Sequence, residues 1–353
     1  MKIVHVIFTF TIGGLETMLV DIINHQCRES SVSLIVINDK INFDLLKTLD
    51  KSVDVFLLGR KESSKGQLLP IFFKIRKIIG QIDPDAIHCH NNNLFPFFFS
   101  RKHITFLTVH SVQLSTLFLK NYRQVFAISA AVGEDIRKRS GINAKIIYNG
   151  IALNEYQSRN NYDFNPDLEV FKIIQVSRLS QRKGQYIAIE SLRLFKKLYP
   201  NIQLELHFAG DGDALPELQA LANLYNLKDR ITFLGQVDRQ WVKTRLQDYH
   251  VLIQPTLFEG FGLTIIEGFA CGLPVIASDL DGPKEIIEIL HSGLLVKPKT
   301  PADLAEKIYR VYQAYVSNSL KMSNYILKDK NQLNMFDIQT TAKAYMENYP
   351  VNK

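Results

Sequence analysis

Short runs of continuous apolar residues alternate with stretches of helical periodicity along most of the chain. The runs lack the polar–apolar alternation of half-exposed strands, so they are typical of strands buried on both faces of a parallel sheet. They lie at residues 3–8, 33–37, 53–57, 86–89, 104–109 and 124–128, and then at 171–176, 203–209, 231–234, 251–254 and 274–277. The pattern predicts an α/β fold.

This alternation starts afresh after a polar, Asn-rich stretch at residues 154–165, which we interpret as a linker. The chain is therefore predicted to form two Rossmann-like, doubly wound domains that face each other across a cleft, one over residues 1–155 and one over 156–335. Ligands of such sheets bind beyond the carboxyl ends of the strands, so candidate chemistry is sought in the strand-to-helix loops.

Composition and charge narrow the class of protein. The chain has 353 residues, 46% of them hydrophobic and 22% charged, which excludes disordered, collagen-like and disulfide-scaffold proteins. Its three scattered cysteines fit a reducing compartment, and it shows neither a secretory signal nor ~18 uninterrupted apolar residues. Residues 1–150 hold 19 Lys/Arg against 12 Asp/Glu, which accounts for the whole net charge of +7. That half is either a mildly basic domain or one that meets phosphate, nucleic acid or a membrane.

Two loops suit an anion. Residues 11–16 contain Gly13-Gly14 before a helix expected to begin near Thr17. Paired glycines and a helix N-terminus admit an anion, although a plain tight turn explains them equally well. Residues 177–184 place Arg178 and Lys183 after a strand, where a planar fork and a point charge would clamp a pyrophosphate. A solvated surface loop is the alternative.

Two further loops are rich in glycine. Residues 209–213 form either an ordinary turn or a surface for a flat nucleobase. Residues 258–268 place Glu259 among glycines and Glu267 about two turns into the next helix, with seven residues between them. The start of that helix would hold phosphate, and Glu267 would accept hydrogen bonds from a ribose. A Gly-x-Gly-x-x-Gly fingerprint is absent, which disfavours a dehydrogenase.

Together these motifs resemble the retaining nucleotide-sugar glycosyltransferases of family four, which have the GT-B fold, and in particular the bacterial surface-polysaccharide type. The resemblance runs nearly end to end. The matching segments are Gly13-Gly14, Ser177-Arg178, Lys183-Gly184, Gly210–Gly212, Glu259 with Glu267, Gly272–Asp279 and Glu285–Ile287. Two departures are Ser177 in place of a common glycine and a single glycine, Gly282, before Pro283, which puts the shape of loop 280–284 in doubt.

The resemblance implies a role for each matching residue. Arg178 and Lys183 would hold the pyrophosphate, and Glu259 would contact the donor sugar. His110 matches the active-site histidine and would position the sugar, plausibly through its 6-hydroxyl. These four form the implied catalytic set. The implied donor-binding residues are Gly13, Gly14, Gly210, Gly212, Gly260, Phe261, Gly262, Leu263, Thr264 and Glu267.

The first domain would hold the acceptor, with Glu16, His88 and His90 as candidate residues on that side. His88 and His90 would point the same way from one strand, but no third metal ligand is evident. Three Asp-x-Asp segments lie in turns, so no metal or other cofactor is expected beyond the nucleotide-sugar co-substrate. The resemblance also implies that residues 336–353 return to the first domain through the last helix.

The predicted function is transfer of a hexose or acetamidohexose, with retention, to a glycan or lipid-linked acceptor in cell-surface polysaccharide synthesis. The resemblance favours a UDP-sugar as donor, with GDP-mannose as the next candidate. One alternative is a sugar-nucleotide 2-epimerase of the same fold. The other is a basic nucleic-acid-binding protein, which the absence of a recognised motif disfavours, so no nucleic acid is expected as partner. The sequence leaves the sugar, linkage, pathway and oligomeric state open.

A helical pattern at residues 65–80 suggests where the protein docks. One stripe is apolar and would pack on the sheet, while Leu69, Phe73, Arg76 and Lys77 gather on the other side, with Lys65 and Lys74 at its flanks. Apolar groups beside cations suit an anionic membrane surface. The expected location is cytoplasmic and peripheral on the inner face of the membrane. Alternatively, Leu69 and Phe73 contact a neighbouring loop.

Overall fold

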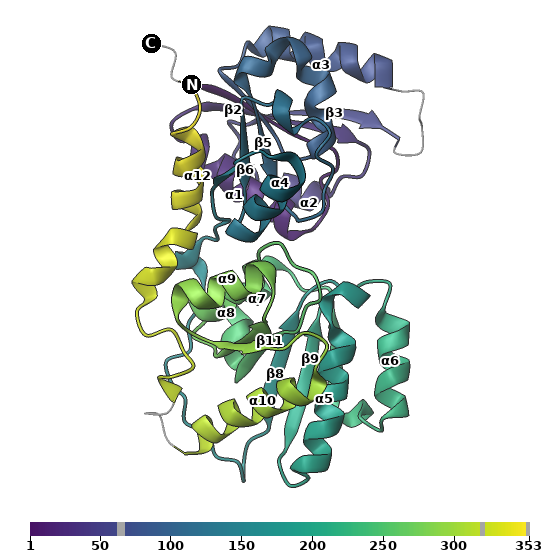
Figure 1. The fold of residues 1–353 in the computed structure, drawn as a ribbon, viewed down its shortest axis with the longest axis vertical. Coiled ribbons are helices and arrows are strands. Elements are labelled where there is room, and N and C mark those ends of the chain that lie inside the picture. Colours follow the sequence, from purple (N-terminus) through teal and green to yellow (C-terminus); the bar gives the residue numbers. More distant parts are fainter. Residues whose placement is uncertain (62–67, 318–321, 351–353) are drawn as a thin grey trace. The chain divides into compact units, whose positions relative to one another are not determined.

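The computed structural model describes residues 1–61, 68–317 and 322–350 (Figure 1). Contacts divide the chain into two compact units, and each has its own sheet and hydrophobic core. Unit 1 comprises Met1–Ala152 and the chain from Met335, and unit 2 comprises Leu153–Asn334. The division falls three residues before the boundary expected from the sequence.

Unit 1 is a seven-stranded parallel sheet in the order β3-β2-β1-β4-β5-β6-β7. Its strands are β1 (Lys2–Ile7), β2 (Ser31–Asn38), β3 (Asp54–Arg60), β4 (Ala86–Cys89), β5 (Thr105–Val109), β6 (Gln124–Ala127) and β7 (Lys145–Ile146). Its helices are α1 (Gly14–Gln26), α2 (Phe43–Leu46), α3 (Leu68–Ile82), α4 (Ala130–Ser140) and α12 (Ile338–Met346), with 3₁₀ segments η2 (Asn92–Ile104) and η3 (Leu119–Asn121).

Unit 2 is a six-stranded parallel sheet in the order β10-β9-β8-β11-β12-β13. Its strands are β8 (Phe171–Val176), β9 (Leu204–Ala209), β10 (Ile231–Gly235), β11 (Val251–Gln254), β12 (Val275–Ser278) and β13 (Leu294–Val296). Its helices are α5 (Gln185–Leu198), α6 (Leu215–Leu224), α7 (Arg239–Arg245), α8 (Leu263–Ala270), α9 (Asp281–Leu290) and α10 (Pro301–Val316). Short 3₁₀ helices are η4 (Leu153–Glu155), η5 (Gln181–Lys183), η6 (Lys228–Arg230), η7 (Leu246–Asp248) and η8 (Lys330–Phe336), the last of which crosses into unit 1.

The strand orders confirm the doubly wound α/β prediction for both units. In each sheet the chain runs outward from the first strand in one direction and then resumes on its other side. The reversal lies between β1 and β4 in unit 1 and between β8 and β11 in unit 2. Loops that follow these strand pairs diverge at the carboxyl edge of the sheet, where such folds bind ligands.

The last helix belongs to unit 1, as expected. α12, drawn in yellow in Figure 1, packs against α1. Tyr345 and Tyr349 are buried in the core of this unit, with their rings against Phe126 and Phe106 respectively. Buried aromatic pairs of this kind stabilise a core beyond their area alone, so the end of the chain is part of the first sheet's packing.

The stretch expected to be a linker is packed onto unit 2. The Gln157 amide donates to the Lys243 carbonyl at 2.8 Å, and the Tyr162 hydroxyl donates to the Gly272 carbonyl at 2.7 Å. Polar and Asn-rich sequence therefore marks irregular backbone here, but that backbone has fixed partners. None of the described helices combines the length and the hydrophobicity needed to cross a bilayer.

Candidate functional site

In unit 2 the loop after β8 is held in one conformation by its neighbours. Gly184 has φ +72°, and a Cβ there would lie 1.9 Å from the carbonyl oxygen of Pro255, in the loop after β11. Only glycine allows both this backbone conformation and this approach. The Gln185 side-chain amide donates to the Ser177 hydroxyl at 2.9 Å and the Arg178 carbonyl at 3.0 Å. The two loops that flank the reversal of the sheet are thereby fixed against each other.

Lys183 and Glu259, both expected in the catalytic set, form an ion pair. One comes from the loop after β8 and the other from the loop after β11. Their side chains are about three-quarters or more buried, with 26% and 19% of their area exposed. The guanidinium of Arg182 lies 5.0 Å from the centre of the Phe258 ring and covers the adjoining part of the loop. The structure therefore places a cation and a carboxylate together at the carboxyl edge of the sheet.

Arg178 is an exposed cation of the same loop. Its side chain is 70% exposed, and its Nη2 atom lies 3.4 Å from the carboxylate of Asp213, which is 96% exposed. An ion pair so open to water contributes about 0–1 kcal/mol. Little therefore holds Arg178 in place, and its guanidinium can turn toward an anionic ligand.

The glycine-rich loop after β9 packs against the Arg178 loop. A Cβ at Gly210 would lie 2.0 Å from the Ser177 carbonyl oxygen, and one at Gly212 would lie 2.2 Å from the Leu179 carbonyl oxygen. The space left by the missing side chains is occupied by backbone. These two glycines are thus explained by close packing of the two loops, and that packing sets the position of residue 178.

The start of α8 lies at the carboxyl edge of the same sheet. Gly262 precedes the helix with φ +113°, and Leu263 and Thr264 are its first two residues. Phe261 is buried and Gly260 lies beside Gly282, where a Cβ would be 2.6 Å from the Gly260 carbonyl oxygen. Residues 280–284, expected to form a loop of uncertain shape, are instead Leu280 and the first turn of α9, which packs on this turn through Gly282.

Glu267 lies in the second turn of α8 and accepts a hydrogen bond of 2.9 Å from the Tyr156 hydroxyl. Burial raises the pKa of Glu267, an effect partly offset by this bond and by Arg239 and Lys243. Burial likewise raises the pKa of Tyr156, so the phenol keeps its proton and remains a donor. Tyr156 comes from the stretch expected to be a linker, and sequence reasoning did not identify it.

In unit 1 the Gly13-Gly14 loop is already filled by a side chain of the protein. A Cβ at Gly13 would lie 2.6 Å from a carboxylate oxygen of Glu16, so this side chain folds back over the start of α1. Burial raises the pKa of Glu16, while bonds from Thr11 lower it. The carboxylate lies at the positive end of the helix dipole. A ligand anion at this place has to displace it or bind beside it.

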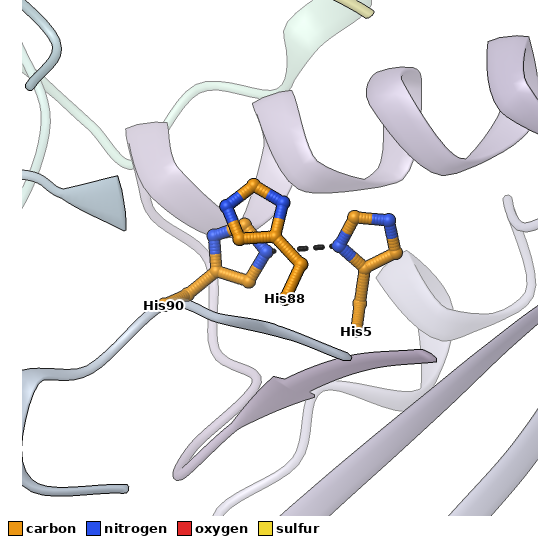
Figure 2. A group of neighbouring side chains, drawn as sticks. All are labelled: His5, His88 and His90. Carbon is orange, nitrogen blue, oxygen red and sulfur yellow. Dashed lines mark hydrogen bonds between the residues drawn. The ribbon is translucent and has the colours of Figure 1, made fainter. Parts of the chain in front are cut away.

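A chain of buried histidines lies at the reversal point of the first sheet. β1 and β4 are adjacent and in a register that pairs His5 with His88. His90 follows β4, and its Nε2 lies 3.0 Å from His5 Nδ1, the bond drawn in Figure 2. His90 Nδ1 lies 3.2 Å from Nε2 of His110, which follows β5. The four rings form one contiguous cluster.

The expected positions of these histidines need correction. His88 and His90 were expected to line the acceptor side, but they are buried, with 0% and 3% of their area exposed. His110 is only partly buried, and desolvation lowers its pKa to about 3. Of the three histidines expected to meet a ligand, only His110 is accessible to one. His5, which lies within the run at residues 3–8 and was not singled out from the sequence, joins the cluster.

Three of these rings lie close enough together to bind one metal ion. Ring nitrogens of His5, His88 and His90 lie within 4.8 Å of one another, which supplies the third ligand that the sequence did not reveal. Each of their six nitrogens, however, already has a hydrogen-bond partner. The partners of His88 are the Tyr349 hydroxyl at 2.6 Å and the Thr108 hydroxyl at 2.7 Å. The arrangement is that of a complete hydrogen-bond network.

Two family models match the chain in succession. Residues 12–155 match glycosyltransferase family 4, and residues 158–329 match glycosyl transferases group 1. Together they follow the division into unit 1 and unit 2 closely.

Individual proteins give the same picture. An uncharacterised glycosyltransferase of Methanocaldococcus jannaschii, MJ1607, is 26% identical over 70% of this chain and 72% of its own length. The gpi3 subunit of phosphatidylinositol N-acetylglucosaminyltransferase from Schizosaccharomyces pombe is 26% identical over 64% of this chain, which spans about half (49%) of that protein.

The structure of Anabaena HepE in complex with UDP and glucose matches with a TM-score of 0.79 at 23% identity, over 98% of each chain. At that identity the likeness establishes the fold. Both sheets, the family models and the relatives therefore agree: this chain is a GT-B-type glycosyltransferase of group 1, similar to family four.

Proposed function

We propose that this protein transfers a hexose or acetamidohexose, with retention, from a nucleotide-diphosphate sugar to a glycan or lipid-linked acceptor in cell-surface polysaccharide synthesis. The observation that carries the proposal is the Lys183–Glu259 ion pair beside the exposed Arg178 in unit 2. It supplies cations for a diphosphate and a carboxylate for a sugar at one edge of one sheet. A UDP-sugar is favoured because the HepE structure contains UDP and glucose.

The cations of unit 2 would stabilise the leaving group. When the bond from the sugar C1 to the diphosphate breaks, negative charge develops on the diphosphate oxygen. Lys183 and Arg178 can meet this charge, since both lie in the loop that follows β8. Charged donors that meet such developing charge are worth several kcal/mol in a transition state. We therefore propose a reaction that does not depend on a metal ion.

Retention follows if the acceptor attacks the face from which the diphosphate departs. The acceptor oxygen forms the new bond to C1, and its proton passes to the departing phosphate oxygen, so no protein base is required. Glu259 would hold the sugar hydroxyls near C1. Glu267, oriented by the Tyr156 hydroxyl, would accept hydrogen bonds from the ribose.

Unit 1 would bind the acceptor at a membrane surface. Leu69 and Phe73 of α3 are 70% and 65% exposed. Beside them lies an apolar groove of about 450 Å³, lined by Phe72 and Phe97 among others. Arg76 and Lys77 are exposed on the same helix, while Lys65 lies outside the described residues. Exposed rings beside cations suit the interface of an anionic leaflet, which here would be the cytoplasmic face. The S. pombe relative, by its name, acts on phosphatidylinositol.

A donor panel tests the proposal. UDP-glucose, UDP-galactose, UDP-N-acetylglucosamine and GDP-mannose are each added, and thermal unfolding and release of nucleotide are followed. A donor at 100 times its Kd stabilises by ~2.7 kcal/mol, or roughly 5–10 °C for a domain of this size. The anomeric configuration of the product, read by NMR, decides between retention and inversion. No shift and no turnover with any sugar nucleotide would refute the proposal.

The same experiment separates the main alternative. A sugar-nucleotide 2-epimerase converts the donor without any acceptor and leaves the nucleotide attached, whereas the proposed transferase releases nucleoside diphosphate. A salt-dependent gel shift would detect the nucleic-acid-binding protein that the basic first half also allows.

A further inference from the structure

A line of hydrogen bonds runs from the core of unit 1 to its accessible histidine. The Gln26 side-chain carbonyl lies 2.8 Å from His5 Nε2, His5 Nδ1 lies 3.0 Å from His90 Nε2, and His90 Nδ1 lies 3.2 Å from His110 Nε2. Figure 2 shows the central link, with the His5 and His90 rings pointing toward each other. Gln26, His5 and His90 are almost fully buried, so water does not compete for these bonds.

All three rings are neutral, because burial lowers the pKa of each. The pKa falls to about 4 for His5 and to about 3 for His110, and it also falls well below the usual value for His90. A neutral imidazole has one N–H donor and one nitrogen acceptor. In a chain of neutral rings, the proton position at one end therefore determines every other proton position.

The Gln26 end sets the direction of this chain. Its carbonyl oxygen can only accept, so His5 carries its proton on Nε2 and accepts on Nδ1. His90 then donates from Nε2 and accepts on Nδ1, and His110 donates from Nε2. Nδ1 of His110 is left without a proton, and none of the described residues forms a hydrogen bond to it.

The Gln26 amide is oriented by its contact with His5, since its carbonyl oxygen is the atom that lies 2.8 Å from His5 Nε2. Its nitrogen has no hydrogen-bond partner among the described residues. Burial raises the pKa of Tyr349 and the Gln26 side chain lowers it, so the two side chains are also neighbours.

We propose that Gln26, His5 and His90 are positioning residues that hold His110 in the Nε2–H tautomer, so that its Nδ1 serves solely as an acceptor for a substrate hydroxyl. The assignment of that hydroxyl to a sugar rests on the proposed function. The tautomer itself is a property of the free protein. An imidazole held the other way would present an N–H, which repels the proton of a hydroxyl donor.

His88 belongs to the cluster but not to this line. Its two nitrogens are bonded to the hydroxyls of Thr108 and Tyr349. It therefore provides a matched control within the same buried environment. Thr108→Val removes a polar partner from His88, just as Gln26→Met removes one from His5, and both substitutions nearly conserve volume.

The first test reads the tautomer directly. Protein labelled with ¹⁵N in histidine is examined by long-range ¹H–¹⁵N correlation, and the His110 signals are assigned by their loss in His110→Gln. We expect an unprotonated Nδ1 and a protonated Nε2 in the wild type and in Thr108→Val. A proton on Nδ1 of His110 in the wild-type protein would overturn the proposal, whatever the enzyme turns out to transfer.

The second test changes the end of the line. Gln26→Met leaves His5 Nε2 without an acceptor, so we expect His110 to populate both tautomers. Turnover should fall at least tenfold, which corresponds to the ~1.4 kcal/mol of about one hydrogen bond. Gln26→Glu keeps an acceptor at this position and should restore both the single tautomer and most of the turnover. Thr108→Val should lower thermal stability while leaving kcat within about twofold.

These outcomes separate the possible failures. If His110 has a single Nε2–H tautomer but no glycosyl transfer is found, the positioning role of Gln26, His5 and His90 stands and the proposed function is wrong. Mixed tautomers of His110 in the wild type, or an unchanged His110 spectrum in a folded Gln26→Met, would show that these residues do not set the tautomer. A shift of the His5, His88 and His90 signals together on addition of stoichiometric Zn²⁺ would make the cluster a metal site and would also overturn the proposal.

Discussion

The ammonium group of Lys183 and the carboxylate of Glu259 are bound to each other, although the two residues are 76 positions apart in the chain. Each of the two groups thereby has a charged partner within the protein itself. The pair keeps both side chains ordered and partly buried before any ligand arrives. In the proposed reaction, a diphosphate that binds Lys183 competes with Glu259 for this ammonium group.

We expect Glu259→Gln to reduce turnover by roughly 10²-fold or more, while nucleoside diphosphate binds within a fewfold of wild-type affinity. The amide retains the shape but loses the charged hydrogen bonds to the sugar, whose removal costs ~3 kcal/mol in a transition state. Steady-state kinetics and calorimetry measure the two quantities. Glu306→Gln, at an exposed position of α10, is the control. Unchanged turnover in Glu259→Gln would remove this residue from the mechanism.

The double variant Arg178→Ala/Lys183→Ala should abolish detectable binding of nucleoside diphosphate. Two of the three cations in the loop after β8 are then lost, and the affinity of a site for phosphate depends on such charges. Lys307→Ala/Arg310→Ala removes an equal charge from α10 of the same unit and should bind normally. Calorimetry that gives wild-type affinity for the first variant would refute the pyrophosphate clamp.

Activity should survive extensive treatment with EDTA, since the cations of unit 2 are proposed to stabilise the leaving group directly. The measurement is turnover before and after chelation, with Mg²⁺, Mn²⁺ or Zn²⁺ restored afterwards. Loss of activity that one of these ions reverses would show that the reaction uses a metal.

Wild-type protein should sediment with vesicles that contain anionic lipid at low salt, and Phe73→Ser/Arg76→Glu/Lys77→Glu should not. Each cation near an anionic leaflet adds ~1 kcal/mol, so reversing two charges weakens binding strongly. The matched control is Leu198→Ser/Lys196→Glu/Lys197→Glu, which changes an exposed leucine and two exposed lysines on α5. If wild type stays in the supernatant, or if both triple variants sediment equally, α3 is not the docking surface.

Acidification from pH 7 to pH 5 should destabilise unit 2 through His250. Burial, together with Arg159 and Lys172, lowers its pKa to about 3. The unfolded chain therefore binds a proton between pH 6.5 and about 3 that the folded unit does not, so stability falls as pH decreases through this range. At pH 5 this difference in proton binding lowers the free energy of unfolding by about 2 kcal/mol.

Urea unfolding at several pH values tests this sign. His250→Asn keeps an acceptor for the Lys172 amide, which now donates to His250 Nδ1 at 2.9 Å, and should flatten the dependence on pH. His291→Asn alters an exposed histidine of the same unit and should leave the slope unchanged. Equal slopes in wild type and His250→Asn would contradict the prediction.

Most of the fold could be predicted because its strands are long enough to bury continuous apolar runs. β4, β8 and β11 begin and end where the sequence indicates. β7 and β13 were missed because they contain only two and three residues. Runs of that length carry no periodicity, and only pairing with a neighbouring strand makes them part of a sheet.

The candidate site could be predicted only where its residues belong to one motif. Glu259 and Lys183 were each identified from their own loops, but their contact depends on β8 and β11 being neighbours. His5 and Tyr156 gave no local signal, since one lies in an apolar run and the other in a polar stretch. His5 contacts His90 because β1 and β4 are neighbours, and Tyr156 contacts Glu267 because its segment packs on unit 2. Neither contact can be predicted from the spacing of residues in the sequence.

The hydroxyl of Tyr349 reaches His88 across 261 positions of sequence, and this has a consequence for how the protein is made. Most of unit 1 is synthesised before unit 2, yet its core lacks Tyr345 and Tyr349 until all of unit 2 has been synthesised. Unit 2 is one continuous stretch of chain, Leu153–Asn334, so all of its residues are present before Tyr345 and Tyr349 are added. The histidine cluster therefore gains its last buried partner only after the whole of unit 2 has been made.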